Sequence, residues 1–181
     1  MKKKFQQTPS QTLGPFFAYG LTPEQYGYNF KDLADNHLYK GDVKSEQITI
    51  KGQIFDGAGV PVNDAMLEIR QDATLDGFGR VGTGTEADNS FLFHSVKPTG
   101  QNGNAPCLNV VLTMRGLLNH LFTRIYFSDE AEANANDSVL NLVPKERRHT
   151  LIARRRETNG RIYYDFNIYM QGENETIFFD A

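Results

Sequence analysis

The metal-binding and nucleophilic side chains of this sequence are few and widely separated. There is one cysteine, Cys107, and there are four histidines, of which the closest pair, His94 and His120, is 26 residues apart. Zinc and iron sites usually take two ligands from one short segment, because a single strand or helix then presents both on the same face. No such pair exists here, so the residues alone predict no metal site and no Cys-based cluster on this chain.

These side chains also have structural interpretations. His94 and His120 fall in predicted strands, where hydrogen-bonded core or interface histidines are more common than metal ligands. Cys107 follows Ala-Pro and precedes Leu, which favours a small buried side chain over a reactive thiol. The sequence lacks both the G-x-S-x-G nucleophile motif and the phosphate-binding G-x-x-x-x-G-K-[ST] loop. We therefore expect no catalytic residue on this chain.

Basic side chains are concentrated in one run, from Lys145 to Arg156, which raises nucleic-acid binding as an alternative. The overall charge disfavours that function, because the chain has 19 Lys and Arg but 22 Asp and Glu and is therefore slightly acidic. No helix-turn-helix, RNA-recognition or zinc-finger motif accompanies the run. Ion pairing with acidic surface of this chain or of a partner is the simpler expectation.

The elements that would position these side chains are mainly β-strands. The chain has 181 residues, the length of one domain, and its alternation of apolar and polar residues predicts strands over 48–54, 65–71, 90–96, 108–114, 120–127, 162–170 and 176–179. A turn at Asp56–Gly59 predicts a hairpin between the first two strands, and Asn159-Gly160 predicts a type I′ turn. We expect an antiparallel β-sandwich over residues 48–181, with one or two short helices near 129–152.

Residues 1–47 show neither strand nor helix periodicity and predict an irregular N-terminal arm of the same domain. Six large aromatic side chains lie between residues 16 and 30, too many to leave in water, so we expect the arm to contact another surface, such as a partner chain. The N-terminal MKKKF is followed by polar QQTPSQT rather than by an apolar signal-peptide core, and no apolar run approaches the ~20 residues of a membrane helix. We expect a soluble, cytoplasmic protein.

Three stretches, in this order, carry a resemblance to a known family. They are TPSQTLGPF at 8–16, TRIYF at 123–127 running into DEAEANAN, and QGENETIFFD at 171–180. The GQIFDGAGVPVNDAMLEI segment, the VKP turn and the MRG triplet at 114–116 lie between them. Along the whole chain, these motifs resemble the intradiol ring-cleaving dioxygenases, specifically the α chains of members built from an α and a β chain.

The resemblance implies a shared fold and a division of roles between two chains. In this family the α and β chains share one β-sandwich fold, and the β chain binds a mononuclear Fe(III) through two Tyr and two His. The two histidines lie on an H-x-H strand, which is similar to residues 106–110 here, with Cys107 and Asn109 in the histidine positions. The tyrosine of the β chain's K-P-G-P-Y-P-W turn has no counterpart at 97–101. The resemblance therefore implies that this chain binds no iron and that Fe(III) sits on a partner β subunit.

The resemblance also implies the reaction and the part of this chain in it. The assembled enzyme, a higher hetero-oligomer of α–β units, would use O₂ to cleave protocatechuate between its hydroxyl-bearing carbons, giving 3-carboxy-cis,cis-muconate. The α chain would complete the substrate cavity of the β subunit through four residues in matching motifs: Thr12, Gly14, Pro15 and Arg115. The Arg115 guanidinium would attract and orient the ring carboxylate of the substrate.

Two departures from the family pattern accompany the match. Arg70 stands where α chains of the family usually carry Trp, and the loop before Gly77 is shorter. These departures leave the substrate preference of the assembled enzyme open. From the residues without the resemblance, the alternative function is a non-catalytic β-sandwich module that binds a small ligand or assembles with another protein.

Overall fold

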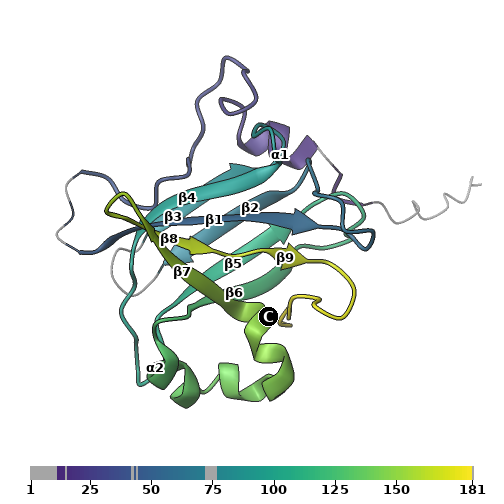
Figure 1. Cartoon of the computed structure of the whole chain (residues 1–181). Coiled ribbons are helices and arrows are strands. Elements are labelled where there is room, and N and C mark those ends of the chain that lie inside the picture. Colours follow the sequence, from purple (N-terminus) through teal and green to yellow (C-terminus); the bar gives the residue numbers. More distant parts are fainter. Residues whose placement is uncertain (1–11, 15, 42, 44, 72–76, 181) are drawn as a thin grey trace, which may run out of the picture.

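The chain folds as a mainly β structure with a few short helices. A computed structural model describes residues 12–14, 16–41, 43, 45–71 and 77–180. In the described residues (Figure 1) the elements are α1 (Phe16–Leu21), β1 (Gln47–Phe55), β2 (Met66–Gln71), β3 (Gly77–Gly82), β4 (Ser90–Val96), β5 (Cys107–Thr113), β6 (Leu121–Phe127), α2 (Ala131–Asn136), the 3₁₀ helices η1 (Leu140–Leu142) and η2 (Lys145–Leu151), β7 (Ile152–Thr158), β8 (Arg161–Asp165) and β9 (Ile168–Tyr169).

The strands follow one continuous path, in the order β3-β2-β5-β6-β7-β8-β1-β4, with β9 also paired to β1. The end strands β3 and β4 contact each other although they are not neighbours in this hydrogen-bonded order, so the sheet is nearly closed and barrel-like. β1 pairs in parallel with β8 and β9, and β6 pairs in parallel with β7. The predicted mainly β class is confirmed, but the pairing is mixed rather than antiparallel throughout.

The predicted hairpin between the first two strands is wrong. The turn itself forms, since the Gly59 N–H donates to the Asp56 carbonyl at 3.0 Å. However, β1 pairs with β4, and β2 pairs with β3 and β5. Val62 and Ala65 are buried in the core between the turn and β2. The chain therefore passes from the turn to another part of the sheet before the second strand begins, which the local alternation could not predict.

The C-terminal hairpin follows its prediction, whereas the closing strand does not. Asn159 and Gly160 both have positive φ, 52° and 71°, as a type I′ turn requires, and they join β7 to β8 in antiparallel register. The segment 176–179 makes only one isolated bridge, between Phe122 and Phe179. It forms no longer ladder because the Thr176 N–H bonds to β9 and the Ile177 carbonyl accepts from a side-chain hydroxyl.

Short helices occupy the predicted region near 129–152 and lie at the end of the sheet remote from α1 (Figure 1). Pro144 is the N-cap of η2. The N-cap of α2 is Glu130, whose side chain makes no capping hydrogen bond, and both Glu130 and the preceding Asp129 contact Lys97. The helical region encloses a small apolar cluster separate from the main core, formed by Ala105, Tyr126, Leu140, Val143 and Leu151. The arm contains α1, a helix that the sequence did not predict.

The alternation along β5 decides which side chains reach the outer face of the sheet. Leu108, Val110 and Leu112 are fully buried in the main core. Cys107 and Asn109 alternate with them, are partly exposed and face outward. The two residues that the family resemblance matches to histidines therefore share one face, as an H-x-H pair would.

Candidate functional site

Three of the four predicted site residues lie in one loop cluster. The Leu13 N–H in the arm donates to the Leu117 carbonyl in the loop between β5 and β6, at 2.8 Å. This hydrogen bond places Thr12 and Gly14, on either side of Leu13, beside the loop that carries Arg115. Gly14 has φ +69°, a backbone conformation that L side chains rarely adopt, so a glycine is needed for this path. Pro15 lies outside the described residues.

Arg115 extends into solvent but is held at its base by a buried carboxylate. Its side chain is 58% exposed, and its Nε lies 3.6 Å from Oδ2 of Asp64, which is only 7% exposed. The other oxygen of Asp64, Oδ1, is buried without a hydrogen-bond partner. Burial raises the pKa of Asp64 above its ordinary value, against the opposing effect of the Arg115 charge. Sequence reasoning missed Asp64, because nothing in its local sequence indicates that it meets Arg115.

The arm contributes a second group to this neighbourhood. Tyr26 packs edge-on against Tyr19, with ring centroids 4.6 Å apart, and its hydroxyl accepts from the Gly84 N–H at 3.4 Å. Burial raises the pKa of Tyr26, and the negative charge of Asp64 adds to this effect. Gln25 fixes the same stretch by bonding to Gly82 through both its amide nitrogen and its oxygen. The arm is thus attached to β3 and to the strand-end region around Asp64.

The outer face of β5 carries Cys107 and Asn109, which the family resemblance matches to histidines. Asn109 lies opposite Arg124 of β6, and Cys107 lies opposite Tyr126. Arg124 donates to the Tyr126 hydroxyl at 3.5 Å, and that hydroxyl donates to the buried Asp137 at 3.0 Å. Burial and the charge of Asp137 raise the pKa of Tyr126, so its phenol stays protonated.

This donor set does not fit an iron ion. An amide and a single thiol stand where the family resemblance implies two imidazoles, and the guanidinium of Arg124 lies beside them. Burial and the charge of Asp137 raise the pKa of Tyr126 and keep its phenol protonated. Among the residues that the structure describes, no group of three or more His, Cys, Asp or Glu is arranged to hold a metal. We therefore assign no iron-dependent step to this chain.

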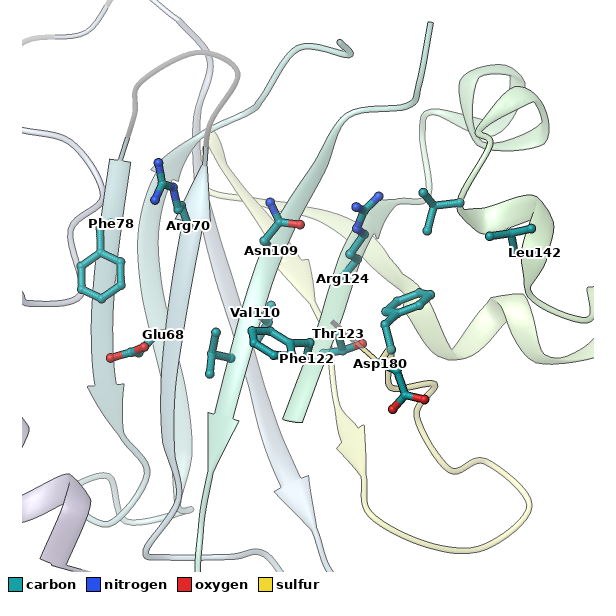
Figure 2. Close-up of a pocket in the computed structure, with 13 residues that line it drawn as sticks. Glu68, Arg70, Phe78, Asn109, Val110, Phe122, Thr123, Arg124, Leu142 and Asp180 are labelled. Carbon is teal, nitrogen blue, oxygen red and sulfur yellow. The ribbon is translucent and has the colours of Figure 1, made fainter. Parts of the chain in front are cut away.

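A groove of about 580 Å³ opens on this same outer face (Figure 2). Its floor comes from β3, β2, β5 and β6, and one wall comes from the η1 region and the C-terminal segment. Arg70, Asn109 and Arg124 lie toward one end, and Glu68 and Asp180 toward the other (Figure 2). The lining residues are Glu68, Arg70, Phe78, Asn109, Val110, Val111, Phe122, Thr123, Arg124, Val139, Leu142, Phe179 and Asp180.

The histidines play other parts. His94, in β4 as predicted, stacks on His37 with ring centroids 4.6 Å apart, and burial followed by the nearby His37 lowers its pKa. His120 was expected in a strand, but it is exposed immediately before β6 and packs edge-on against Phe122. The loop that bends back at Gly116 leaves this position outside the ladder.

Arg155 and Arg156 of the basic run form ion pairs within the chain, as expected. Arg156 bonds to Asp165 at 3.0 Å, and Arg155 lies 3.7 Å from Asp129 and 3.4 Å from Glu157. Arg147 and Arg148 donate to backbone carbonyls. These contacts direct much of the positive charge of the run to the chain itself rather than to a nucleic acid.

Comparisons with known proteins give the chain its relatives. No protein-family model matches it. It is 50% identical to the protocatechuate 3,4-dioxygenase alpha chain of Burkholderia cepacia, over 97% of this chain and 98% of that one, and 42% identical to the alpha chain of Pseudomonas putida, over 96% of each. It is 27% identical to the beta chain of Burkholderia cepacia, over 80% of this chain and 73% of that one.

Solved structures share the fold at lower identity. The dioxygenase domain of a dioxygenase–carbohydrate-binding fusion from Streptomyces sp. SirexAA-E matches with a TM-score of 0.61 at 21% identity, over 91% of this chain and 97% of that one. Catechol 1,2-dioxygenase from Pseudomonas arvilla C-1 matches with a TM-score of 0.54 at 14% identity, over 80% of this chain and 59% of that one. In the described residues, no helix is long and apolar enough to cross a membrane. Because it is 50% and 42% identical to two alpha chains over nearly their full length, we conclude that the chain belongs to the protocatechuate 3,4-dioxygenase alpha-chain family of intradiol dioxygenases.

Proposed function

We propose that this chain is the iron-free alpha subunit of a protocatechuate 3,4-dioxygenase. It completes the substrate cavity of an iron-bearing beta subunit, and the assembled enzyme cleaves protocatechuate with O₂ to 3-carboxy-cis,cis-muconate. The observation that carries the proposal is the 50% identity to an alpha chain over 97% of this chain. The amide and thiol at the histidine positions support the assignment of iron to the partner.

Within this proposal, the beta subunit's Fe(III) supplies the oxygen chemistry, and this chain supplies part of the wall and a positive charge. Arg115 directs its exposed guanidinium toward the ring carboxylate of protocatechuate. Thr12 offers a hydroxyl, and Gly14 and Pro15 shape the backbone of the wall. Excluding water from the closed cavity strengthens the attraction between the guanidinium and the carboxylate.

The organisation of the molecule is part of the same proposal. Residues 48–181 form the domain that carries the strands, and residues 1–47 form an arm that contacts the partner. The protein acts in the cytoplasm as a higher hetero-oligomer of alpha–beta units. The exposed apolar side chains of the arm support this arrangement, since Phe16 is 79% and Phe30 is 74% exposed in the chain by itself.

Reconstitution with a beta chain tests the proposal. The chain purified alone should contain no stoichiometric iron and show no O₂ uptake with protocatechuate. Co-expression with a beta chain that carries the H-x-H strand should give a coloured complex that consumes O₂ and forms 3-carboxy-cis,cis-muconate. Stoichiometric iron on the chain alone would contradict the division of roles. The two chains could form a stable complex while the beta chain alone cleaves protocatechuate at the same rate as the complex. That result would support the non-catalytic assembly module instead.

A further inference from the structure

We propose that Gln25 of the N-terminal arm is a positioning residue for Arg115. It acts through the backbone at the end of β3 and through the segment that carries Asp64, so the seating of the arm sets the direction of the guanidinium. The effect on substrate binding rests on the function proposed above. The coupling between the arm and Arg115 is a property of this chain alone and can be measured without the partner.

The first link is the side-chain amide of Gln25, which holds the backbone of Gly82 at the end of β3. Its Nε2 donates to the Gly82 carbonyl at 2.8 Å, and its Oε1 accepts from the Gly82 N–H at 2.8 Å. The same nitrogen donates to the hydroxyl of Thr85 at 2.7 Å. Gln25 therefore uses both N–H groups and the oxygen of its amide to attach the arm to this stretch of backbone.

Tyr26, the next residue of the arm, contacts the same stretch. Its hydroxyl accepts from the Gly84 N–H at 3.4 Å, and a Cβ on Gly82 would collide with that hydroxyl. A Cβ on Gly84 would collide with the carbonyl oxygen of Asn63. The backbone here is thus packed between the arm on one side and Asn63 on the other, and the two glycines permit this close approach.

Thr83, between the two glycines, is fully buried and connects this backbone to the segment that carries Asp64. Its hydroxyl donates to the Val62 carbonyl at 2.7 Å and accepts from the Ala65 N–H at 3.2 Å. The Thr83 N–H also donates to the Ala65 carbonyl at 2.9 Å. These bonds hold the chain on both sides of Asp64, whose carboxylate lies 3.6 Å from the Nε of Arg115.

The contact between Asp64 and Arg115 is sensitive to a displacement of this segment. Its length of 3.6 Å exceeds that of a good hydrogen bond, and the other carboxylate oxygen of Asp64 has no hydrogen-bond partner. The attraction between the two charges weakens as their separation grows and as water enters between them. Arg115 is mostly exposed, so a small movement of Asp64 would admit water and release the guanidinium.

The NMR signal of the Arg115 Nε–H in the full chain without its partner tests the coupling. Arg115→Gln identifies this signal by removing it, and Asp64→Asn gives its position without the carboxylate charge. We expect Gln25→Leu to move the signal at least half of the way from the wild-type position to that in Asp64→Asn. In the matched control Gln53→Leu, a glutamine on β1 also loses a bond to a backbone carbonyl, and the signal should not move. An unmoved signal in Gln25→Leu would overturn the proposal.

Thr83 provides a second pair of variants, which keeps the test valid if Gln25→Leu does not fold. Thr83→Val preserves the shape of the side chain but removes the hydroxyl, so it should move the Arg115 signal in the same direction. Thr83→Ser preserves the hydroxyl and should leave the signal close to its wild-type position. An unmoved signal in Thr83→Val, or an equal movement in both variants, would overturn the route through this hydroxyl.

The kinetics of the complex with the beta subunit test the consequence for the substrate. Gln25→Leu should raise the KM for protocatechuate several-fold and change kcat little. The KM for catechol should also change little, because catechol has no carboxylate. The double variant Gln25→Leu/Arg115→Gln should be no worse than Arg115→Gln alone, since Gln25 acts through Arg115.

The two measurements separate failure of this proposal from failure of the proposed function. A KM that Arg115→Gln raises and Gln25→Leu leaves unchanged would overturn the positioning role of Gln25. If the NMR signal moves as expected while Arg115→Gln leaves the KM unchanged, the coupling is supported. The role of Arg115 in binding the substrate carboxylate would then be wrong.

Discussion

At the scale of single residues, the pairing of Asp64 with Arg115 is the most informative contact. A buried carboxylate with one unpartnered oxygen lies 3.6 Å from the guanidinium of a mostly exposed arginine. Leaving a buried charged oxygen unpaired costs free energy, so the residue is poorly explained by stability alone. Its position is explained if it holds the base of Arg115 while the rest of the guanidinium faces a substrate carboxylate. Asp64 is then a positioning residue.

We predict that Asp64→Asn raises the KM of the assembled enzyme for protocatechuate several-fold, with a small change in kcat. The amide keeps the volume of the side chain but not the charge that orients Arg115. Arg115→Gln should raise the same KM about tenfold or more, since it removes the charge that meets the carboxylate. Steady-state O₂ uptake with protocatechuate and with catechol measures both effects. Catechol has no carboxylate, so its KM should change little in either variant.

A matched control separates this role from a general loss of structure. Asp88→Asn removes an exposed aspartate that pairs with Lys51, and it should leave both KM values unchanged. The double variant Asp64→Asn/Arg115→Gln should be no worse than Arg115→Gln alone, because Asp64 acts through Arg115. Additive losses in the double variant would remove Asp64 from the substrate site. Unchanged KM values in Arg115→Gln would remove both residues.

At the scale of elements, a charged cluster joins the end of β4, the start of α2 and β8. The Lys97 ammonium contacts Asp129 at 2.7 Å and Glu130 at 2.6 Å. The hydroxyl of the fully buried Tyr164 donates to Asp129 at 2.9 Å. Burial would raise the pKa of Asp129, but the hydrogen bonds from Lys97 and Tyr164 outweigh it and lower the pKa. This cluster accounts for Asp129 lying next to α2 without capping it.

We predict that Asp129→Asn lowers the free energy of unfolding by about 1 to 2 kcal/mol at pH 7. The folded-state pKa of Asp129 lies below its ordinary value of 3.8. Its stabilisation is therefore fully present above that value and is lost as the pH falls through the folded-state pKa. Urea unfolding of the wild type and of Asp129→Asn at pH 7, 5 and 3 measures the difference in their free energies of unfolding. This difference should be equal at pH 7 and pH 5 and smaller at pH 3.

The exposed pair of Arg156 and Asp165 provides the comparison. Both side chains are more than 40% exposed, so Asp165→Asn should lower the free energy of unfolding by less than Asp129→Asn does at pH 7. A cost for Asp129→Asn no greater than that of Asp165→Asn would mean that the cluster does not fix the start of α2. A deficit that stays constant down to pH 3 would contradict the lowered pKa of Asp129.

At the scale of the whole molecule, the N-terminal arm is anchored at some points and exposed at others. Ala18, Thr22 and Leu38 are buried against the strands. Phe16, Phe30 and Leu33 are 79%, 74% and 94% exposed. Large apolar side chains on one segment with this exposure indicate a contact surface for another chain.

We predict that the double variant Phe16→Ser/Phe30→Ser weakens assembly with the beta subunit at least tenfold and leaves the thermal midpoint of the chain alone within a few degrees. The two phenylalanine side chains contribute to the interface but not to the core of the chain. Size-exclusion chromatography and sedimentation of the mixed chains measure the first effect, and thermal unfolding measures the second. Val60→Ser, which removes another exposed apolar side chain, is the control. Wild-type assembly by the double variant would exclude these two side chains from the interface.

Local patterns in the sequence determined the mainly β class, most of the strands, the turn at Asn159-Gly160 and the short helices near 129–152. These features depend on alternation and turn chemistry over a few neighbouring residues, which a single chain displays directly. The motifs also identified the family, which the 50% identity to an alpha chain bears out. The resemblance to the family implied which side chains stand at the histidine positions.

Only the tertiary structure decided which strands pair and which distant side chains meet. β1 and β2 lie in different parts of the sheet although they are consecutive, and Val62 and Ala65 between them pack into the core while the turn before them is exposed. Asp64 contacts Arg115, and Leu13 contacts Leu117, only because strands and loops far apart in sequence become neighbours. For the same reason Arg70 lies opposite Asn109, and Asn109 lies opposite Arg124. Such contacts depend on the register and packing of whole elements, and no local pattern encodes them.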